Sequence, residues 1–160
     1  MATTNKQKPT TAYMTKWTYL GQEVKTLKDV PECCPFYIYK ITFKPVAKNR
    51  FYYFGSKQIY SITNPKISLK RKKELYTGKG SYKTRERKVK ESNWKKYQSS
   101  SKVVQEKLLT EEADFEILEF FDTKAEMLLK EAYLITNSFL NYDPMILNGW
   151  VSVKQFKPKK

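Results

Sequence analysis

Aromatic and β-branched residues alternate in the first half of the chain, and this pattern predicts β-strands. The run FYIYKITF at 36–43 is bounded by Pro35 and Pro45 and is typical of one strand. The run FYYF at 51–54 predicts a second strand that ends at Gly55, so we expect an antiparallel hairpin with a connection of about seven residues. Alternation in the first strand places four side chains on one face, namely Tyr37, Tyr39, Ile41 and Phe43.

Three consecutive serines at 99–101 predict the start of a helix near Lys102, because serine side chains cap helix N-termini. We expect this helix to turn Val104, Leu108 and Leu109 toward the core. Hydroxyl groups, a lysine and a helix N-terminus together also suit an oxyanion such as phosphate, although a helix cap alone explains them as well.

A third strand and a second helix follow. FEILEFF at 115–121 predicts the strand, and Thr123 with Glu126 fits a capping box that opens a helix through about Asn137. The apolar stripe of this helix consists of Ala125, Leu128, Leu129, Ala132 and Ile135. Glu131 lies beside apolar helix neighbours, where a carboxylate is unfavourable unless it is paired or binds a metal. The alternative is an edge position from which the side chain bends into water.

Two segments have no clear period. We leave Trp17–Leu27 unassigned. In 58–96, a proline and two glycines interrupt any long element, while 69–75 and 84–97 are each compatible with a helix. The second of these has almost no apolar face, so it is either a helix that contacts phosphates or a solvated insertion.

The net charge of the chain indicates the kind of molecule that it binds. The 160 residues suffice for one domain, and 31 Lys and Arg against 16 Asp and Glu give a net charge of +15. Residues 66–96 hold 13 Lys and Arg against 3 Glu, whereas residues 105–148 hold 10 acidic residues against 3 Lys. Such a basic segment favours a polyanion, since each neutralised phosphate releases counterions. The alternatives are a merely soluble basic surface or a ribosomal-type structural protein.

Other residue types restrict the chemistry and the compartment. The chain has no histidine, which excludes Ser–His and Cys–His nucleophiles and histidine-containing zinc sites. Acid–base chemistry therefore falls to Tyr, Lys, Glu or Asp. Cys33 and Cys34 are adjacent, so a structural disulfide between them is not expected and a reducing cytoplasm is the default location. We expect neither a secretory signal nor a membrane span.

The order of these motifs along the chain is similar to that of a known protein family. YIYKI, YYFGSK, YQSSSK, FEILEFFDTKAEM, a helical glutamate and a late asparagine resemble the GIY-YIG endonuclease family, most closely its small phage-encoded members, over Pro35–Trp150. The resemblance implies an α/β (α+β) fold in which a three-stranded antiparallel sheet is flanked by helices. It also implies two tyrosines and a basic side chain at the scissile phosphate, and a glutamate that binds one divalent metal, Mg²⁺ or Mn²⁺.

The family motifs map onto particular residues of this chain. Tyr39 and Tyr53 match the two motif tyrosines, Gly55 the second-half glycine, Glu131 the metal ligand and Asn148 the late asparagine. We expect Tyr39 to act as general base and Tyr53 to bind the water or phosphate, although plain core packing also explains both. The candidates for the family's basic residue are Lys57 and Lys102, followed by Arg71, Arg85 and Arg87.

Two positions depart from the motifs. Tyr37 stands in place of the first glycine, and Phe54 in place of the central isoleucine of the second half.

The expected organisation has three parts: an N-terminal extension at 1–34, a nuclease-like domain at 35–150 with a basic insertion at 58–96, and a basic tail at 151–160. The expected function is metal-dependent hydrolysis of DNA phosphodiester bonds by a homing or restriction-like endonuclease. The alternative is a catalytically inactive nucleic-acid-binding protein of the same fold.

The expected partner is double-stranded DNA, with no membrane, in the cytoplasm of a bacterial host if the protein is phage-encoded. The sequence leaves monomer and homodimer open. The expected DNA contacts are Lys70, Arg71, Lys72, Lys73, Lys83, Arg85, Arg87, Lys88, Lys95 and Lys96.

Overall fold

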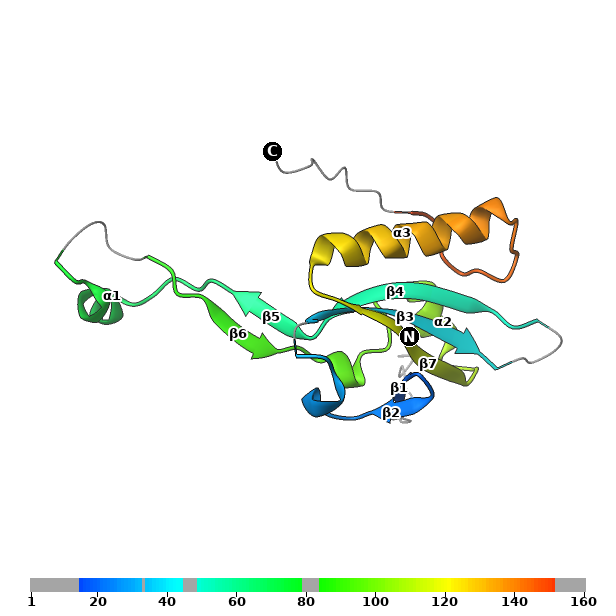
Figure 1. The fold of residues 1–160 in the computed structure, drawn as a ribbon, viewed down its shortest axis with the longest axis horizontal. Coiled ribbons are helices and arrows are strands. Elements are labelled where there is room, and N and C mark those ends of the chain that lie inside the picture. The colour runs from blue at the N-terminus through cyan, green and yellow to red at the C-terminus, as the bar shows by residue number, and fades with distance from the viewer. Residues whose placement is uncertain (1–14, 33, 45–48, 79–83, 152–160) are drawn as a thin grey trace, which may run out of the picture.

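A mixed five-stranded sheet forms the centre of the molecule, with helices on both faces (Figure 1). The computed structural model describes residues 15–32, 34–44, 49–78 and 84–151. The main sheet has the order β2-β1-β7-β3-β4 and consists of β1 (Trp17–Tyr19), β2 (Gln22–Val24), β3 (Phe36–Phe43), β4 (Tyr52–Gln58) and β7 (Ala113–Phe121). The other elements are η1 (Leu27–Asp29), β5 (Tyr60–Thr63), α1 (Leu69–Leu75), β6 (Lys88–Glu91), η2 (Trp94–Lys96), α2 (Lys102–Lys107) and α3 (Lys124–Leu140).

Strand β3 lies inside the sheet and is buried on both faces. Its predicted inward face is confirmed, because Tyr37, Tyr39, Ile41 and Phe43 are each at most 1% exposed. Ile38 is fully buried on the opposite face, which α3 covers (Figure 1). This double burial explains why the run is aromatic and aliphatic at nearly every position rather than alternating with polar residues.

The expectation of three strands is wrong, because the unassigned segment at 17–27 supplies two more. β1 pairs with β2 in antiparallel and with β7 in parallel orientation. Trp17 is 1% exposed, and its ring meets those of Tyr37, Tyr39 and Phe115 edge-on. Strands of three residues show no period, and the partners of Trp17 are distant in sequence, so local pattern reasoning misses them.

The second strand of the hairpin continues further than expected. β4 does not end at Gly55 but runs to Gln58, with Gly55 opposite Tyr39 and Tyr53 opposite Ile41. β4 is the edge strand of the sheet. The chain after α3 lies along this edge, since the Tyr52 amide donates to Met145 and the Leu147 amide donates to Tyr52.

Helix α2 begins near Lys102 as expected, and Val104 is fully buried. The expected burial of Leu109 is wrong, because α2 ends at Lys107 and the Leu109 side chain is 65% exposed. The serine cap also differs from the expectation. Ser101 is the N-cap residue but makes no capping bond through its side chain.

Helix α3 has the predicted start, where the Thr123 hydroxyl accepts a hydrogen bond from the Glu126 amide. Its buried face is rotated relative to the expected stripe. Met127, Ile135 and Ser138 are buried, whereas Leu129 is 63% exposed. Glu131 falls on this inward face between Met127 and Ile135. In the described part of the chain, no helix is long and apolar enough to span a membrane.

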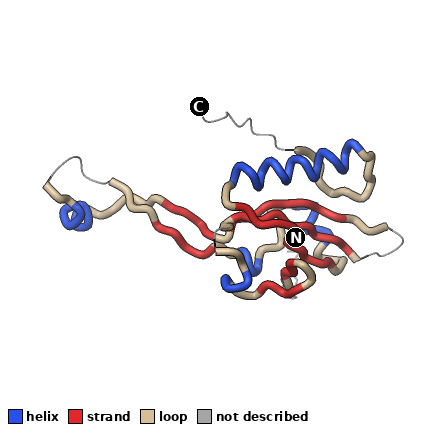
Figure 2. The backbone as a smooth tube through the Cα atoms, viewed as in Figure 1, coloured by secondary structure: helices blue, strands red, loops and turns tan. Residues whose placement is uncertain are grey.

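Residues 60–78 and 84–91 project from the sheet as a separate arm (Figures 1 and 2). β5 and β6 form a two-stranded antiparallel ribbon, and α1 lies beyond it. The helix expected at 69–75 is confirmed as α1. The helix considered for 84–97 is wrong, because this segment forms β6 and η2 and its apolar residues serve two different structures. Val89 pairs across the ribbon with Ile62, whereas Trp94 is fully buried in the core.

Candidate active site

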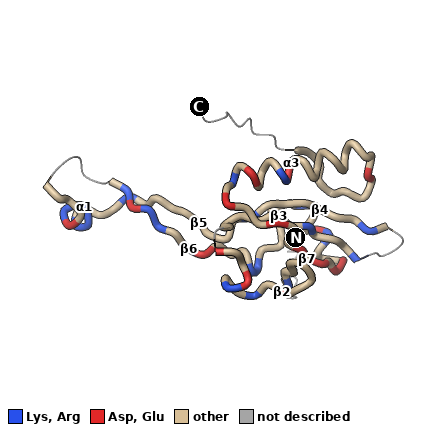
Figure 3. Tube along the Cα trace, viewed as in Figure 1, with Lys and Arg blue, Asp and Glu red and all other residues tan. Residues whose placement is uncertain are grey.

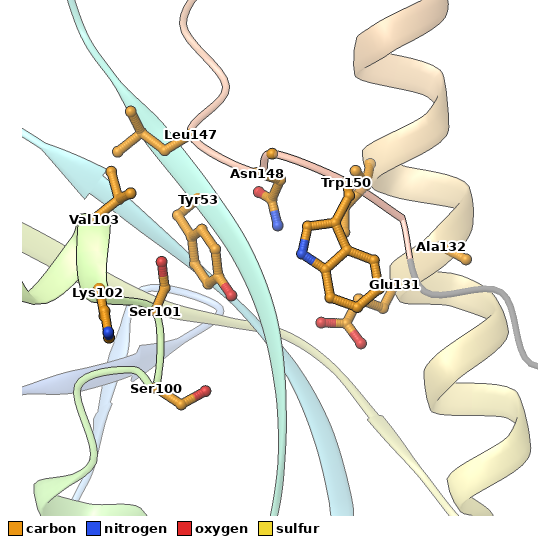
Figure 4. A pocket seen from close by; sticks show the side chains of 12 residues that line it. Tyr53, Ser100, Ser101, Lys102, Val103, Glu131, Ala132, Leu147, Asn148 and Trp150 are labelled. Atoms are coloured by element: carbon orange, nitrogen blue, oxygen red, sulfur yellow. The ribbon is translucent and has the colours of Figure 1, made fainter.

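A cavity of about 480 Å³ opens at the edge of the sheet, around β4 (Figure 4). Its walls come from β4, the start of α2, α3 and the segment after α3. The lining residues are Tyr53, Ser100, Ser101, Lys102, Val103, Glu131, Ala132, Ile135, Leu147, Asn148, Gly149 and Trp150. Parts of the chain that are far apart in sequence thus place a phenol, an ammonium group and a carboxylate around one space.

The cavity reaches both faces of the sheet because β4 is an edge strand. Alternation along β4 places Tyr53 on the α2 side and Ser56 on the α3 side. Figure 4 shows Tyr53 and Lys102 on one side of the strand, and Glu131 and Asn148 on the other. A group bound at the edge of β4 can therefore meet side chains from both layers.

Glu131 presents a partly buried carboxylate to this cavity. Its Oε2 accepts a hydrogen bond of 2.8 Å from the Ser56 hydroxyl. Burial raises the pKa of the Glu131 carboxyl, and the bond from Ser56 partly offsets that rise. Among the described residues Glu131 has no Lys or Arg partner within ion-pair distance. A half-buried carboxylate without a counterion, facing open space, suits a divalent cation.

The donor set fits one hydrated ion. The described chain contains no group of three or more His, Cys, Asp or Glu that could hold a metal. Mg²⁺ commonly keeps several waters and binds protein through one or two carboxylates. Glu131 would therefore hold such an ion alone, with water and substrate oxygen as the remaining ligands.

Tyr39 and Tyr53 lie side by side, as the hairpin predicts. Their ring centroids are 6.4 Å apart. Tyr39 is 1% exposed and lies behind the cavity wall, whereas Tyr53 lines the cavity. A Cβ atom added to Gly55 would lie 2.3 Å from the Tyr39 hydroxyl, so the Tyr39 ring crosses β4 at the one position without a side chain.

Ser99 connects the two tyrosines. It is 5% exposed, and its hydroxyl accepts the Ser101 amide at 3.0 Å. Burial raises the pKa of Tyr39 well above its ordinary value, and a hydrogen bond with Ser99 opposes that rise. The pKa of Tyr53 is raised by burial and by the charge of Glu131, again opposed by Ser99. Both phenols therefore carry their protons at neutral pH unless a cation in the cavity favours the phenolate.

The two first candidates for the basic residue occupy different places. Lys102 lines the cavity beside Tyr53. Lys57 is not among the lining residues, and its Nζ lies 3.8 Å from the centroid of the Tyr97 ring. Arg71 and Arg85 lie on the arm, where Arg71 pairs with Glu74 and Glu86 and Arg85 donates to the Asn64 carbonyl.

Comparison with known proteins agrees with this geometry. The family model "Putative endonuclease segE, GIY-YIG domain" matches residues 17–145. The chain belongs to this GIY-YIG endonuclease family. The match starts in β1, so it includes β1 and β2, which the predicted boundaries assign to an N-terminal extension. No curated protein and no solved structure gives a significant match.

Asn148, the predicted counterpart of the late asparagine, has a structural task. Its Oδ1 accepts the Phe54 amide and its Nδ2 donates to the Phe54 carbonyl, both at 2.9 Å. The side chain thus replaces a neighbouring strand at the sheet edge. It attaches the segment after α3 to β4 directly beside Tyr53.

Tyr37, which stands in place of the first motif glycine, is a core residue. Its ring packs against Trp17, Trp94 and Phe120. Its hydroxyl is the one buried side-chain polar atom in the described chain without a hydrogen-bond partner. Burial accordingly raises its pKa. Phe54, the second departure, is 8% exposed and stacks edge-on against Tyr52.

The expected DNA contacts of this GIY-YIG protein lie mostly on the arm (Figure 3). Lys70, Arg71, Lys72 and Lys73 are on α1. Arg85 and Arg87 lie in the segment before β6, and Lys88 is the first residue of β6. Lys95 and Lys96 are in η2 at the base of the arm, where Lys95 pairs with Glu91 at 3.0 Å. Lys83 lies outside the described residues.

Sequence reasoning missed Ser56 and Trp150, and it considered Ser99 only as a helix cap or as part of an oxyanion site. The importance of Ser56 and Ser99 comes from contacts with Glu131 and the tyrosines that only the fold creates. Trp150 is different, because a tryptophan beyond the last helix is a detectable signal for an exposed aromatic group.

Proposed function

We propose that this protein is a metal-dependent DNA endonuclease of the homing or restriction type. One observation supports this proposal most strongly: Tyr53, Lys102 and Glu131 line the same cavity at the edge of β4. Hydrolysis of a phosphodiester needs an activated water, neutralisation of phosphorane charge and stabilisation of the leaving oxygen. The three side chains match these needs one by one.

The chain's own residues divide the work as follows. The Lys102 ammonium group binds the scissile phosphate and neutralises the charge that develops on it. The Tyr53 phenol hydrogen-bonds the attacking water, and Ser99 holds the phenol in place. A divalent cation bound to Glu131 would supply Lewis-acid stabilisation of the leaving oxygen.

The role of general base falls to Tyr53 more readily than to Tyr39. Burial raises the pKa of Tyr39 further from neutrality, and Tyr39 does not line the cavity. Tyr53 faces the space where a water molecule would bind. Burial and the charge of Glu131 raise the pKa of Tyr53, and a cation bound to Glu131 would offset the second of these causes. Tyr39 then supports the site by packing over Gly55 and by its bond with Ser99.

The arm supports double-stranded DNA as the substrate. Its lysines on α1 are exposed or nearly so, and α1 buries no residue. Such a surface contributes to binding through phosphate contacts and counterion release. We propose that the arm holds the duplex while one phosphate enters the cavity.

Cleavage of supercoiled plasmid DNA by the purified protein tests the proposal. Wild-type protein should nick or linearise the plasmid with Mg²⁺ or Mn²⁺ and should be inactive in EDTA. Tyr53→Phe should slow cleavage by about 10²-fold or more, the scale on which general base catalysis contributes. Tyr39→Phe should have a smaller effect, and an equal or larger effect would return the base role to Tyr39.

An inactive binding protein of the same fold gives a different result. It would shift the plasmid in a salt-sensitive manner but would leave it uncut with every divalent metal. That outcome would contradict the proposed enzyme and favour the binding alternative.

A further inference from the structure

Trp150 differs from the other two tryptophans of the chain. Trp17 and Trp94 are 1% and 0% exposed, whereas Trp150 is 73% exposed. It is also part of the cavity wall, on the same side of β4 as Glu131 (Figure 4). Single exposed apolar side chains are common on protein surfaces, but Trp150 is the exposed aromatic side chain that lines the same cavity as Glu131 and Lys102.

The backbone that carries Trp150 is fixed. Asn148, two residues earlier, is 8% exposed and is bonded to Phe54 at both ends of its amide. The Leu147 amide donates to the Tyr52 carbonyl at 2.8 Å. In the described chain the indole itself makes no ring contact or hydrogen bond. The backbone next to Trp150 is attached to β4, and the indole ring is exposed. This arrangement suits an aromatic side chain on which a planar group stacks.

We propose that the Trp150 indole stacks on the nucleobase next to the scissile phosphate. This inference rests on the proposed function, since it needs a phosphodiester in the cavity. Each phosphate in DNA lies next to a nucleobase, and every nucleobase has a π-face on which an aromatic side chain can stack. Lys102 and Glu131 in the same cavity make a purely apolar partner unsuitable.

The platform has a consequence for the substrate. A base inside a duplex is stacked on its neighbours, so it reaches Trp150 only after leaving the helix. We therefore infer that the enzyme binds an unstacked nucleotide at the cut site. Mismatched or single-stranded positions need less free energy for this step and should be cut faster than the same sequence fully paired.

Intrinsic fluorescence sums the emission of all three tryptophans, and the difference between wild type and Trp150→Phe isolates the contribution of Trp150. The experiment uses the full-length protein in EDTA and a short dye-labelled single-stranded oligodeoxynucleotide, which engages the cavity without turnover. Fluorescence anisotropy of the dye gives the affinity, and tryptophan emission gives the stacking. The variants are Trp150→Phe, which keeps an aromatic face, and Trp150→Leu, which keeps only apolar character.

Binding should quench the wild-type emission, and Trp150→Phe should show no such change. Trp150→Phe should bind close to wild type, whereas Trp150→Leu should bind on the order of tenfold more weakly, as expected for the loss of one stacked base. Unchanged emission at saturating oligonucleotide, or equal affinity of the Phe and Leu variants, overturns the inference. If plasmid is still cut in that case, the proposed function survives without it. If the protein neither binds nor cuts DNA, both fail together.

Discussion

The cavity and the arm are built differently: the cavity has buried, hydrogen-bonded side chains, and the arm has exposed, charged ones. In the cavity, Asn148 is buried, and Glu131 and Asn148 have defined hydrogen-bond partners on β4, while Ser99 is buried behind Tyr53. On the arm, α1 buries no residue, and its lysines are exposed or nearly so. The contrast suggests that chemistry depends on positioned groups, whereas binding of the phosphate backbone depends on the number of charges.

The same contrast holds for ion pairs. Arg71 on α1 has two carboxylate partners at 3.1 and 3.5 Å, and all three side chains are substantially exposed. Exposed pairs of this kind contribute little stability and exchange readily for phosphate. Glu131 has no such partner among the described residues, and burial keeps the pKa of its carboxyl high. The cavity therefore retains an unfavourable charge that a bound cation relieves.

After loss of the Glu131 carboxylate, replacement of the Lys102 ammonium group should have the largest effect on cleavage. Lys102→Ala should reduce the rate of plasmid cleavage by about 10²–10³-fold, the range for loss of one preorganised group that stabilises transition-state charge. DNA affinity, measured by anisotropy on a duplex, should change little because the arm supplies most contacts. The matched control is Lys57→Ala, since Lys57 lies on Tyr97 outside the cavity. Equal losses in both variants would contradict the assignment of Lys102.

The packing behind the cavity should be the next most sensitive feature. Gly55→Ala introduces a Cβ that would lie 2.3 Å from the Tyr39 hydroxyl, so the ring or the strand must move. We expect a loss of about 1–3 kcal/mol in unfolding free energy by urea denaturation, together with reduced cleavage. Gly149→Ala is the control for the unfolding free energy, because a Cβ there meets nothing within 4 Å. A fully stable Gly55→Ala protein would show that Tyr39 does not occupy this place.

Neutralisation of the arm should affect binding and leave chemistry intact. Lys70, Lys72 and Lys73 replaced together by Gln should weaken duplex binding and lower the slope of log K against log salt by about 0.9 for each phosphate that the arm no longer neutralises. A matched triple variant, Lys16, Lys28 and Lys124 replaced by Gln, removes the same charge from other exposed positions. If the two variants have the same salt slope, the arm has no special part in binding.

The smallest expected effect concerns stability and pH. Burial raises the folded-state pKa of Glu131, so the stability from this group is fully present below the ordinary glutamate pKa and is lost as pH rises through the raised folded value. Glu131→Gln should therefore have a higher Tm than wild type at neutral pH and a similar Tm in acid. The exposed Glu106→Gln is the control. A neutral-pH Tm at or below that of wild type would mean that the carboxylate is not held at a stability cost.

The sequence permits prediction where local pattern and burial agree. The alternating face of β3 and the N-cap of α3 follow from residue type alone, and the tyrosine pair follows from the hairpin. β1 and β2 cannot be predicted in this way, because these short strands depend on packing of Trp17 against residues that are distant in sequence. The rotated face of α3 arises because the polar residues Glu131 and Ser138 take inward positions for hydrogen bonding to β4.

The site shows the same division. The positions of Tyr53, Glu131 and Asn148 are predictable from motif order, although their roles stay predictions, and these residues line the cavity together with Lys102. The choice between Lys102 and Lys57 is not predictable, since both are lysines near a motif and only the fold shows which of them lines the cavity. The contacts of Ser56 with Glu131 and of Ser99 with Tyr53 are not predictable from local pattern, because the fold brings these partners together.

The most direct test of the division between cavity and arm uses a small activated phosphodiester, bis(p-nitrophenyl) phosphate, which is too short to need the arm. With saturating Mg²⁺ or Mn²⁺, wild-type protein and the Lys70, Lys72 and Lys73 triple variant should hydrolyse it at the same rate. Glu131→Gln should be inactive while still binding duplex DNA. Loss of hydrolysis in the arm variant, or wild-type hydrolysis by Glu131→Gln, would contradict the account.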